Sequence, residues 1–113
     1  MAKESPTITG ACEAFLKSLQ EERYYDAHED LEALWFPRRF EDHDEVKLWK
    51  GFINAAVSFE LIKKGRLIPS QTPWKTYMKY LGLLDGLETE HKHIYVTMVH
   101  LIEQQRGRVC PIS

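Results

Sequence analysis

The sequence has little cysteine, no long apolar run and almost no excess of charge of either sign. Its two cysteines, Cys12 and Cys110, stand near opposite ends without the CxxC or CxxH spacing of a metal knuckle. We therefore expect two reduced thiols and no disulfide framework. No stretch approaches the roughly 20 apolar residues of a membrane span, and the N-terminal residues lack the apolar run of a signal peptide. The expectation is a cytoplasmic protein with no membrane partner.

The nearly balanced charge argues against partners that recognise a protein by its net charge. The 113 residues include 15 basic and 17 acidic residues, which gives a formal net charge of -2. No global field would draw such a chain to nucleic acid, so we expect no nucleic-acid partner. Hydrophobic residues make up 43% and charged residues 28%, which is ordinary globular usage. The length suits one domain, and we predict a single domain over residues 1–113.

Strand signals are nearly absent as well, because no segment alternates apolar and polar residues for long. Apolar residues instead recur at three- and four-residue steps, the period of an amphipathic helix. A helix stop is expected near Phe36, because Pro37 disfavours the α conformation at the residue before it. The pattern predicts an all-α, single-domain bundle of about five helices. Their expected spans are residues 7–19, 24–36, 42 or 44 to 64, 73–87 and 92–106.

The third of these helices is the expected centre of the bundle. It is apolar nearly all round from Leu48 to Ile62, as a helix packed on several sides should be. Gly65 follows its last residues and favours a stop there. Lys50, Asn54 and Ser58 fall at four-residue steps and form a narrow polar stripe. Asn54 therefore reaches water or faces a buried polar group.

The fourth helix has a start signal and two apolar strips. Thr72 is placed to cap it, with Pro73 at the first helical position, where the missing N–H costs nothing. Gly82 and Gly86 weaken its last turns. The second strip suggests another partner, such as a second copy of the chain, but it also fits the protein's own core, and both readings stay open. The main strip comprises Trp74, Tyr77, Met78, Leu81 and Leu84, and the second comprises Tyr80, Leu83 and Leu87.

The best site candidate lies in residues 24–35, YYDAHEDLEALW. His28 and Glu32 are four residues apart, so an imidazole and a carboxylate can meet on one helix face. Tyr25 neighbours Glu32 on the outer flank, and Trp35 belongs to the buried side next to His28. The other acidic residues of the stretch are expected to point away from this face: Asp26, Glu29 and Asp30.

A histidine paired with a carboxylate can accept a proton, hold a metal or lock two helices together. The HExxH metal pattern fails here because Glu32 stands where the second histidine would be. None of the remaining histidines is an obvious further ligand, and no nucleophile motif or glycine-rich phosphate loop is present. We therefore expect no metal site and no cofactor. The remaining histidines are His43, His91, His93 and His100.

Two segments resemble a known family. Residues 24–35 and residues 49–56, WKGFINAA, are similar to the prokaryotic domain-of-unknown-function family 309, whose members carry an AHE-x-LE-x-x-W helix followed by a GLIQLA-like helix. The resemblance covers about residues 11–84 and leaves the final helix outside. It implies a small all-helical bundle with signature residues at His28, Glu32 and Trp35, and with Gly51 in the second motif. Asn54 stands where the family usually has glutamine. The family implies no biochemical activity.

The first functional hypothesis is a non-catalytic binding or interaction module. His28, Glu32 and Asn54 would form a polar cluster that fixes the packing of the second and third helices. The same cluster, with Tyr25 and Trp35, would line a groove for an unidentified small molecule or protein.

The competing hypothesis is a small hydrolase acting on an anionic compound, with or without a metal. His28 would be the general base and Glu32 would orient it, because an unperturbed histidine titrates near about 6.5. Arg38 or Arg39 would bind the anion, although a solvated basic loop is the simpler interpretation of that pair.

Overall fold

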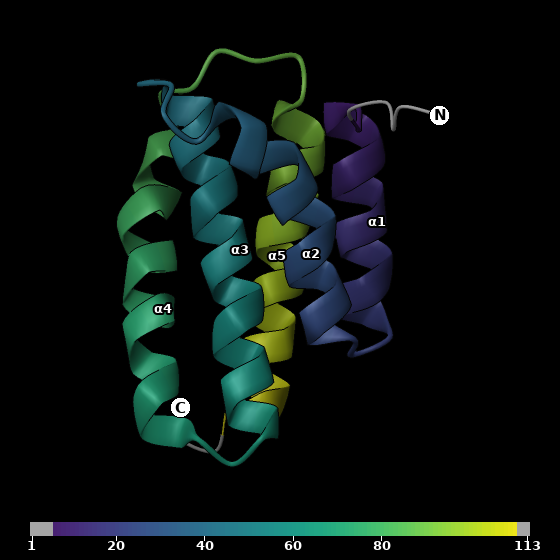
Figure 1. Ribbon diagram of the computed structural model, residues 1–113, viewed down its shortest axis with the longest axis vertical. Coiled ribbons are helices and arrows are strands. Elements are labelled where there is room, and N and C mark those ends of the chain that lie inside the picture. The colour runs from purple at the N-terminus through teal and green to yellow at the C-terminus, as the bar shows by residue number, and fades with distance from the viewer. Residues whose placement is uncertain (1–5, 111–113) are drawn as a thin grey trace.

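The structure is a computed structural model that describes residues 6–110, and all of its regular elements are helical (Figure 1). This confirms the predicted all-α bundle of five helices. Consecutive helices run in opposite directions, and the segment between α4 and α5 crosses the top of the bundle in Figure 1. The elements are α1 (Ile8–Gln20), α2 (Tyr24–Trp35), the 3-10 helix η1 (Phe36–Arg38), α3 (Asp44–Lys63), α4 (Leu67–Leu81), the 3-10 helix η2 (Gly82–Leu84) and α5 (Lys92–Val109).

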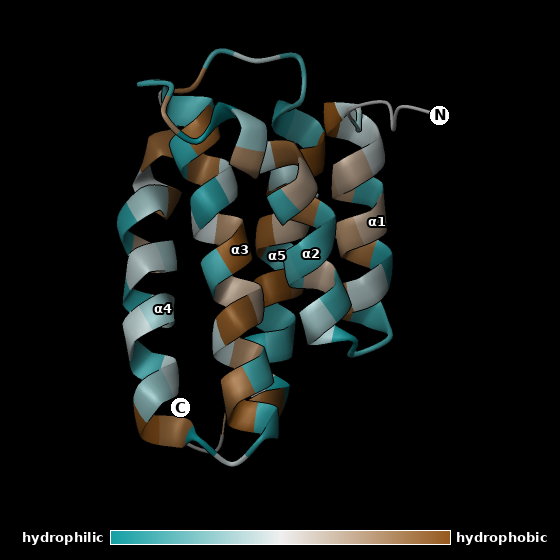
Figure 2. Ribbon diagram, viewed as in Figure 1, coloured by the Kyte–Doolittle hydropathy of each residue, from teal (hydrophilic) through white to brown (hydrophobic). Residues whose placement is uncertain are grey.

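Helix α3 is central, as its apolar surface predicts. It packs against α2, α4 and α5, and hydrophobic residues recur along it in Figure 2. Trp49, Phe52 and Phe59 from this helix are fully buried. Gly51 lies where α4 comes closest, because a Cβ added there would stand 3.0 Å from the Cβ of Tyr80. The glycine therefore permits the tight packing of α3 against α4.

The ends of α3 are also those predicted. The Nδ1 atom of His43 accepts a hydrogen bond from the backbone N–H of Glu45 at 3.0 Å, which caps the helix start. The helix ends at Lys63, and Gly65 has a φ of 77°, the left-handed conformation that glycine adopts without strain.

The predicted start of the fourth helix was wrong. Helix α4 begins at Leu67, so Pro73 lies inside it and Thr72 does not cap it. The first turn is held by tertiary contacts, since Ser58 of α3 donates a hydrogen bond to the carbonyl of buried Ser70 at 2.8 Å. This hydrogen bond lies on the N-terminal side of Pro73, and the helix continues past the proline.

The two predicted strips of α4 were also partly wrong. Met78, assigned to the main strip, is 52% exposed. Tyr80, assigned to the second strip, lies against Gly51 of α3, and Leu87 is buried in the core. Of the second strip, Leu87 thus belongs to the protein's own core, whereas Tyr80 and Leu83 are half-buried.

The last helix continues beyond its predicted end at residue 106. Helix α5 runs through Gly107 to Val109, because its last turns are tied to α2. Gln105 is buried and accepts a hydrogen bond from the hydroxyl of Tyr24 at 2.7 Å. Within residues 6–110, no helix combines the length and the apolar character needed to cross a membrane.

Candidate functional site

His28 and Glu32 form the predicted pair on α2. The Nε2 atom of His28 lies 2.9 Å from Oε2 of Glu32, and the two side chains are 22% and 46% exposed. The ring of Tyr25 is tilted against that of His28, with 5.6 Å between the ring centroids. The three residues therefore form one partly solvated cluster, and the ring nitrogen farthest from the backbone is the one bound to the carboxylate.

This cluster borders a pocket of about 290 Å³ between α2 and α3, which we call the His28 groove. Val57 and Leu61 of α3 are partly buried and provide apolar walls, while Tyr25 is 56% exposed at the rim. An ion pair of 3.5 Å between Lys64 and Glu60 marks the rim on α3. The groove is lined by Tyr25, His28, Val57, Glu60, Leu61 and Lys64.

Trp35 and Asn54, the other two predicted binding residues, do not line the His28 groove. The side-chain amide of Asn54 donates a hydrogen bond to the carbonyl of Lys50 in its own helix, at 2.8 Å. The ring of Trp35 is partly buried against the core, with the ammonium of Lys50 6.0 Å from its centroid. The structure thus joins Tyr25 to the histidine and places Trp35 and Asn54 nearer the start of α3.

Glu29 and Asp30, which were predicted to lie away from the His28–Glu32 face, differ in their surroundings. Glu29 is exposed, as predicted. Asp30 was expected to point away from the His28–Glu32 face, and its carboxylate turns toward α1, where it accepts a hydrogen bond of 2.8 Å from Ser18. Ser18 is buried, so Asp30 satisfies a hydroxyl that would otherwise have no acceptor. Its role is to join α1 to α2.

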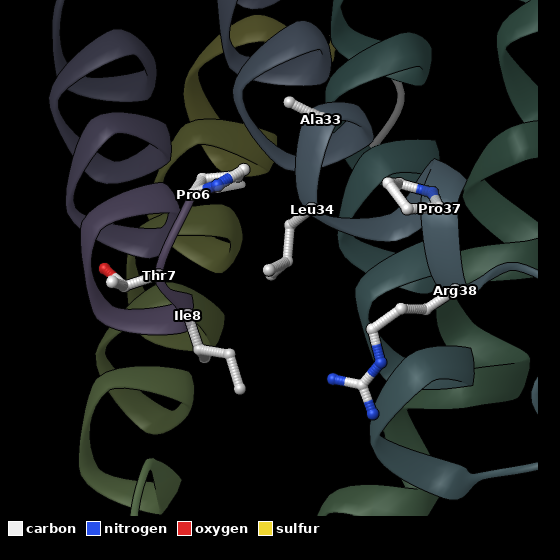
Figure 3. Close-up of a pocket in the computed structure, with 7 residues that line it drawn as sticks. All are labelled: Pro6, Thr7, Ile8, Ala33, Leu34, Pro37 and Arg38. Atoms are coloured by element: carbon white, nitrogen blue, oxygen red, sulfur yellow. The ribbon is translucent and has the colours of Figure 1, made fainter. Parts of the chain in front are cut away.

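Arg38 and Arg39 line two pockets other than the His28 groove. Figure 3 shows Arg38 from η1 facing Leu34 of α2 and Ile8 of α1 around a pocket of about 270 Å³. The guanidinium of Arg38 already donates two hydrogen bonds to Glu41, at 2.9 and 3.0 Å. The structure therefore does not gather His28 and an anion-binding arginine in one pocket.

A polar network that the sequence did not reveal lies between α3 and α5. The buried indole N–H of Trp49 donates to the hydroxyl of Tyr95 at 2.9 Å, and that hydroxyl donates to Glu45 at 2.5 Å. Thr89 donates to the same carboxylate oxygen at 2.9 Å. Burial, followed by the bond to Glu45, raises the pKa of Tyr95 above its usual range. Glu45 and Tyr95 are far apart in the sequence, and no spacing rule relates them.

No cluster within residues 6–110 brings together three or more histidine, cysteine or acidic side chains in a way that could hold a metal ion. The residues that line the His28 groove supply an imidazole, a carboxylate, a phenol and an ammonium. These groups can orient a ligand by hydrogen bonds, and the apolar walls can bury part of it.

Comparison with known proteins gives a family match. The model of a family described as "Domain of unknown function (DUF309)" matches residues 12–71, more than half of the chain. The matched segment runs from α1 into the first turns of α4 and includes His28, Glu32, Trp35 and Asn54. No curated protein and no solved structure matches.

Proposed function

We propose that this chain, which belongs to the DUF309 family of domains of unknown function, is a non-catalytic binding module that works through the His28 groove. The observation that carries the proposal is the groove's composition, with apolar walls from Val57 and Leu61 and with His28 at the edge, held by Glu32 from outside the lining. Ligand sites commonly combine apolar walls with a few polar groups that fix orientation.

The expected occupant is an apolar or aromatic side chain, presented by a peptide or by a small molecule. Val57 and Leu61 offer apolar surface that an occupant would remove from water. The half-exposed ring of Tyr25 can cover one face of that occupant. Lys64 can then donate to polar groups beside it through its ammonium, and His28 can accept from them through Nδ1, because its Nε2 is bound to Glu32.

The geometry supports a binding role better than the hydrolase alternative. The Nε2 atom of His28 is bound to Glu32, which leaves Nδ1, the nitrogen next to the side-chain stem, as the remaining base. Arg38 and Arg39, the proposed anion-binding residues of a hydrolase, line other pockets. Among the residues that line the groove, Lys64 carries an ammonium, which is paired with Glu60, and none is a serine, threonine or cysteine that could act as a nucleophile.

The proposal is tested by titrating the isotopically labelled protein with N-acetyl-tryptophanamide and N-acetyl-leucinamide while recording amide resonances. Shifts should concentrate at Tyr25, His28, Leu61 and Lys64. Leu61→Ala should weaken them, whereas Leu101→Ala, the same truncation at a partly buried position on α5, should leave them unchanged.

Two outcomes would contradict the binding module. The first is a set of shifts spread evenly over the surface with no dependence on Leu61. The second is turnover of a phosphoester, ester or amide substrate that His28→Ala abolishes while the fold, followed by circular dichroism, stays intact. The second result would favour the hydrolase.

A further inference from the structure

Another pocket, at the other end of α2, is lined by residues from the end of α2, the start of α3 and the end of α4. Figure 1 shows these three segments at the same end of the bundle. The pocket measures about 360 Å³, and we call it the Trp35 pocket. Three aromatic side chains line it: Trp35 from α2, Phe40 from the following loop and Tyr80 from α4. Phe40 is 87% exposed, so an apolar ring is held in water at the pocket's mouth. None of these three residues lines the His28 groove.

The acidic residues at this pocket are already neutralised. Glu41 binds the guanidinium of Arg38 through two hydrogen bonds, and Asp42 lies 3.0 Å from the ammonium of Lys47. These partners hold the pKa values of both carboxyls below their usual range. The two carboxylates therefore do not compensate the remaining positive charge of the pocket.

That remaining charge belongs to Arg39 and Lys50. In the part of the chain that the structure describes, neither side chain forms an ion pair with a carboxylate. One Nη atom of Arg39 donates to the carbonyl of Phe36 at 2.6 Å, and its guanidinium lies 4.5 Å from the ring centre of Phe40. The ammonium of Lys50 lies 6.0 Å from the ring centre of Trp35. Two uncompensated cations thus stand beside aromatic rings.

We infer that the Trp35 pocket binds a purine nucleoside monophosphate. A phosphate monoester carries a charge of about -1.5 to -2 at neutral pH, which matches the two cations. Arg39 retains free N–H donors, whose forked geometry suits phosphate oxygens, and Lys50 adds a point charge. The base would stack on the aromatic side chains at the mouth, as bases do on aromatic platforms. The volume lies within the range of small-molecule sites.

The inference requires both the ring and the phosphate to contribute to affinity. Adenosine 5′-monophosphate, adenosine and ribose 5-phosphate separate the two contributions when each is titrated against the labelled protein at low salt. We expect the nucleotide to bind at least about tenfold more tightly than either fragment, because stacking and charge pairing each contribute a step of that order. The indole resonance of Trp35 and the amide resonance of Lys50 should shift.

Matched variants assign the binding to this pocket. Lys50→Ala and Arg39→Ala should each weaken the nucleotide by about tenfold, as expected for a charge-assisted contact. Lys75→Ala removes the same charge from an exposed position on α4 and should leave the affinity unchanged. Phe40→Ala should weaken the nucleotide but not ribose 5-phosphate, and the 87% exposure of Phe40 keeps this substitution from disturbing the core.

Several results would overturn the inference. If ribose 5-phosphate binds as tightly as the nucleotide, the base contributes nothing and the site is only a charged surface. If Lys75→Ala and Lys50→Ala lower the affinity for the nucleotide equally, the binding is non-specific attraction between charges. Binding of a single-stranded oligonucleotide without binding of the mononucleotide would indicate a strand-binding surface instead. The N-acetyl-tryptophanamide titration tests the His28 groove independently of the nucleotide titration, because the two pockets share no residue.

Discussion

His28 owes its position to contacts with Tyr25 and Glu32 within one helix, and it also borders α3. A hydrogen-bonded side-chain pair at four-residue spacing on a helix contributes about 0.2–0.5 kcal/mol to stability. The side chain of His28 is only 22% exposed, so its packing adds to that value. The pair is thus a modest structural contact as well as the edge of the groove.

His28→Ala should lower the free energy of unfolding by about 1 kcal/mol, which corresponds to a fall of roughly 4 °C or more in melting temperature. Glu32→Gln keeps a hydrogen-bond acceptor while it removes the charge, and its effect should be smaller. Thermal denaturation followed by circular dichroism measures both. An unchanged melting temperature for His28→Ala would show that His28 does not contribute to the packing of the bundle.

At the scale of the elements, the contact between α3 and α4 depends on one glycine. Gly51→Ala would place a Cβ 3.0 Å from the Cβ of Tyr80 and 3.7 Å from the carbonyl oxygen of Tyr77. The helices would have to separate, and we expect a loss of about 1–3 kcal/mol in the free energy of unfolding, measured by urea denaturation.

The matched control is Gly107→Ala in α5, where the added Cβ meets nothing within 4 Å. This substitution removes a glycine from a helix and should raise stability by about 0.4–1 kcal/mol. If both substitutions change stability in the same direction, the close approach of α3 and α4 does not depend on the missing side chain.

The network between α3 and α5 gives a second prediction at this scale. Tyr95→Phe removes the acceptor of the buried indole N–H of Trp49 and a donor to Glu45. An unsatisfied buried donor costs about 1–3 kcal/mol, and the unfolding free energy should fall by that amount. Tyr80→Phe, at a tyrosine of α4 outside this network, should cost less. Equal effects in urea denaturation would show that the network does not hold α5.

The molecule as a whole should lose stability at alkaline pH because ionisable groups are buried in its core, Cys12 and Tyr24 among them. Burial raises the pKa of Cys12 from 9.0 to about 12 and that of Tyr24 from 10.0 to about 12. Both groups ionise more readily when the chain is unfolded. Their contribution is therefore fully present below pH 9.0 and is lost as the pH rises toward about 12.

The expected measurement is a melting temperature that falls continuously between pH 9.0 and about 12. Cys12→Ala removes the group that ionises first in the unfolded chain, so the decline should begin at higher pH in this variant. Cys110→Ser retains Cys12 and serves as the control. A melting temperature that is constant over this range would contradict burial of the two groups.

Much of the bundle could be predicted from residue spacing. The central place of α3 follows from its apolar body and its end follows from Gly65, while the pairing of His28 with Glu32 follows from a four-residue step. Local rules failed where a distant contact decides the structure. Helix α4 starts before Pro73 because Ser58 binds its first turn, and α5 passes Gly107 because Gln105 binds Tyr24.

The sequence alone determined the helical class, the central helix and the histidine–glutamate pair, because helical periodicity depends only on residues three and four positions apart. The tertiary structure decided which of those residues share a pocket. It placed Tyr25 and His28 opposite Leu61, gathered Trp35, Phe40 and Tyr80 from three segments, and joined Glu45 to Tyr95. Such groupings depend on how the helices pack together, and no spacing within one helix specifies them.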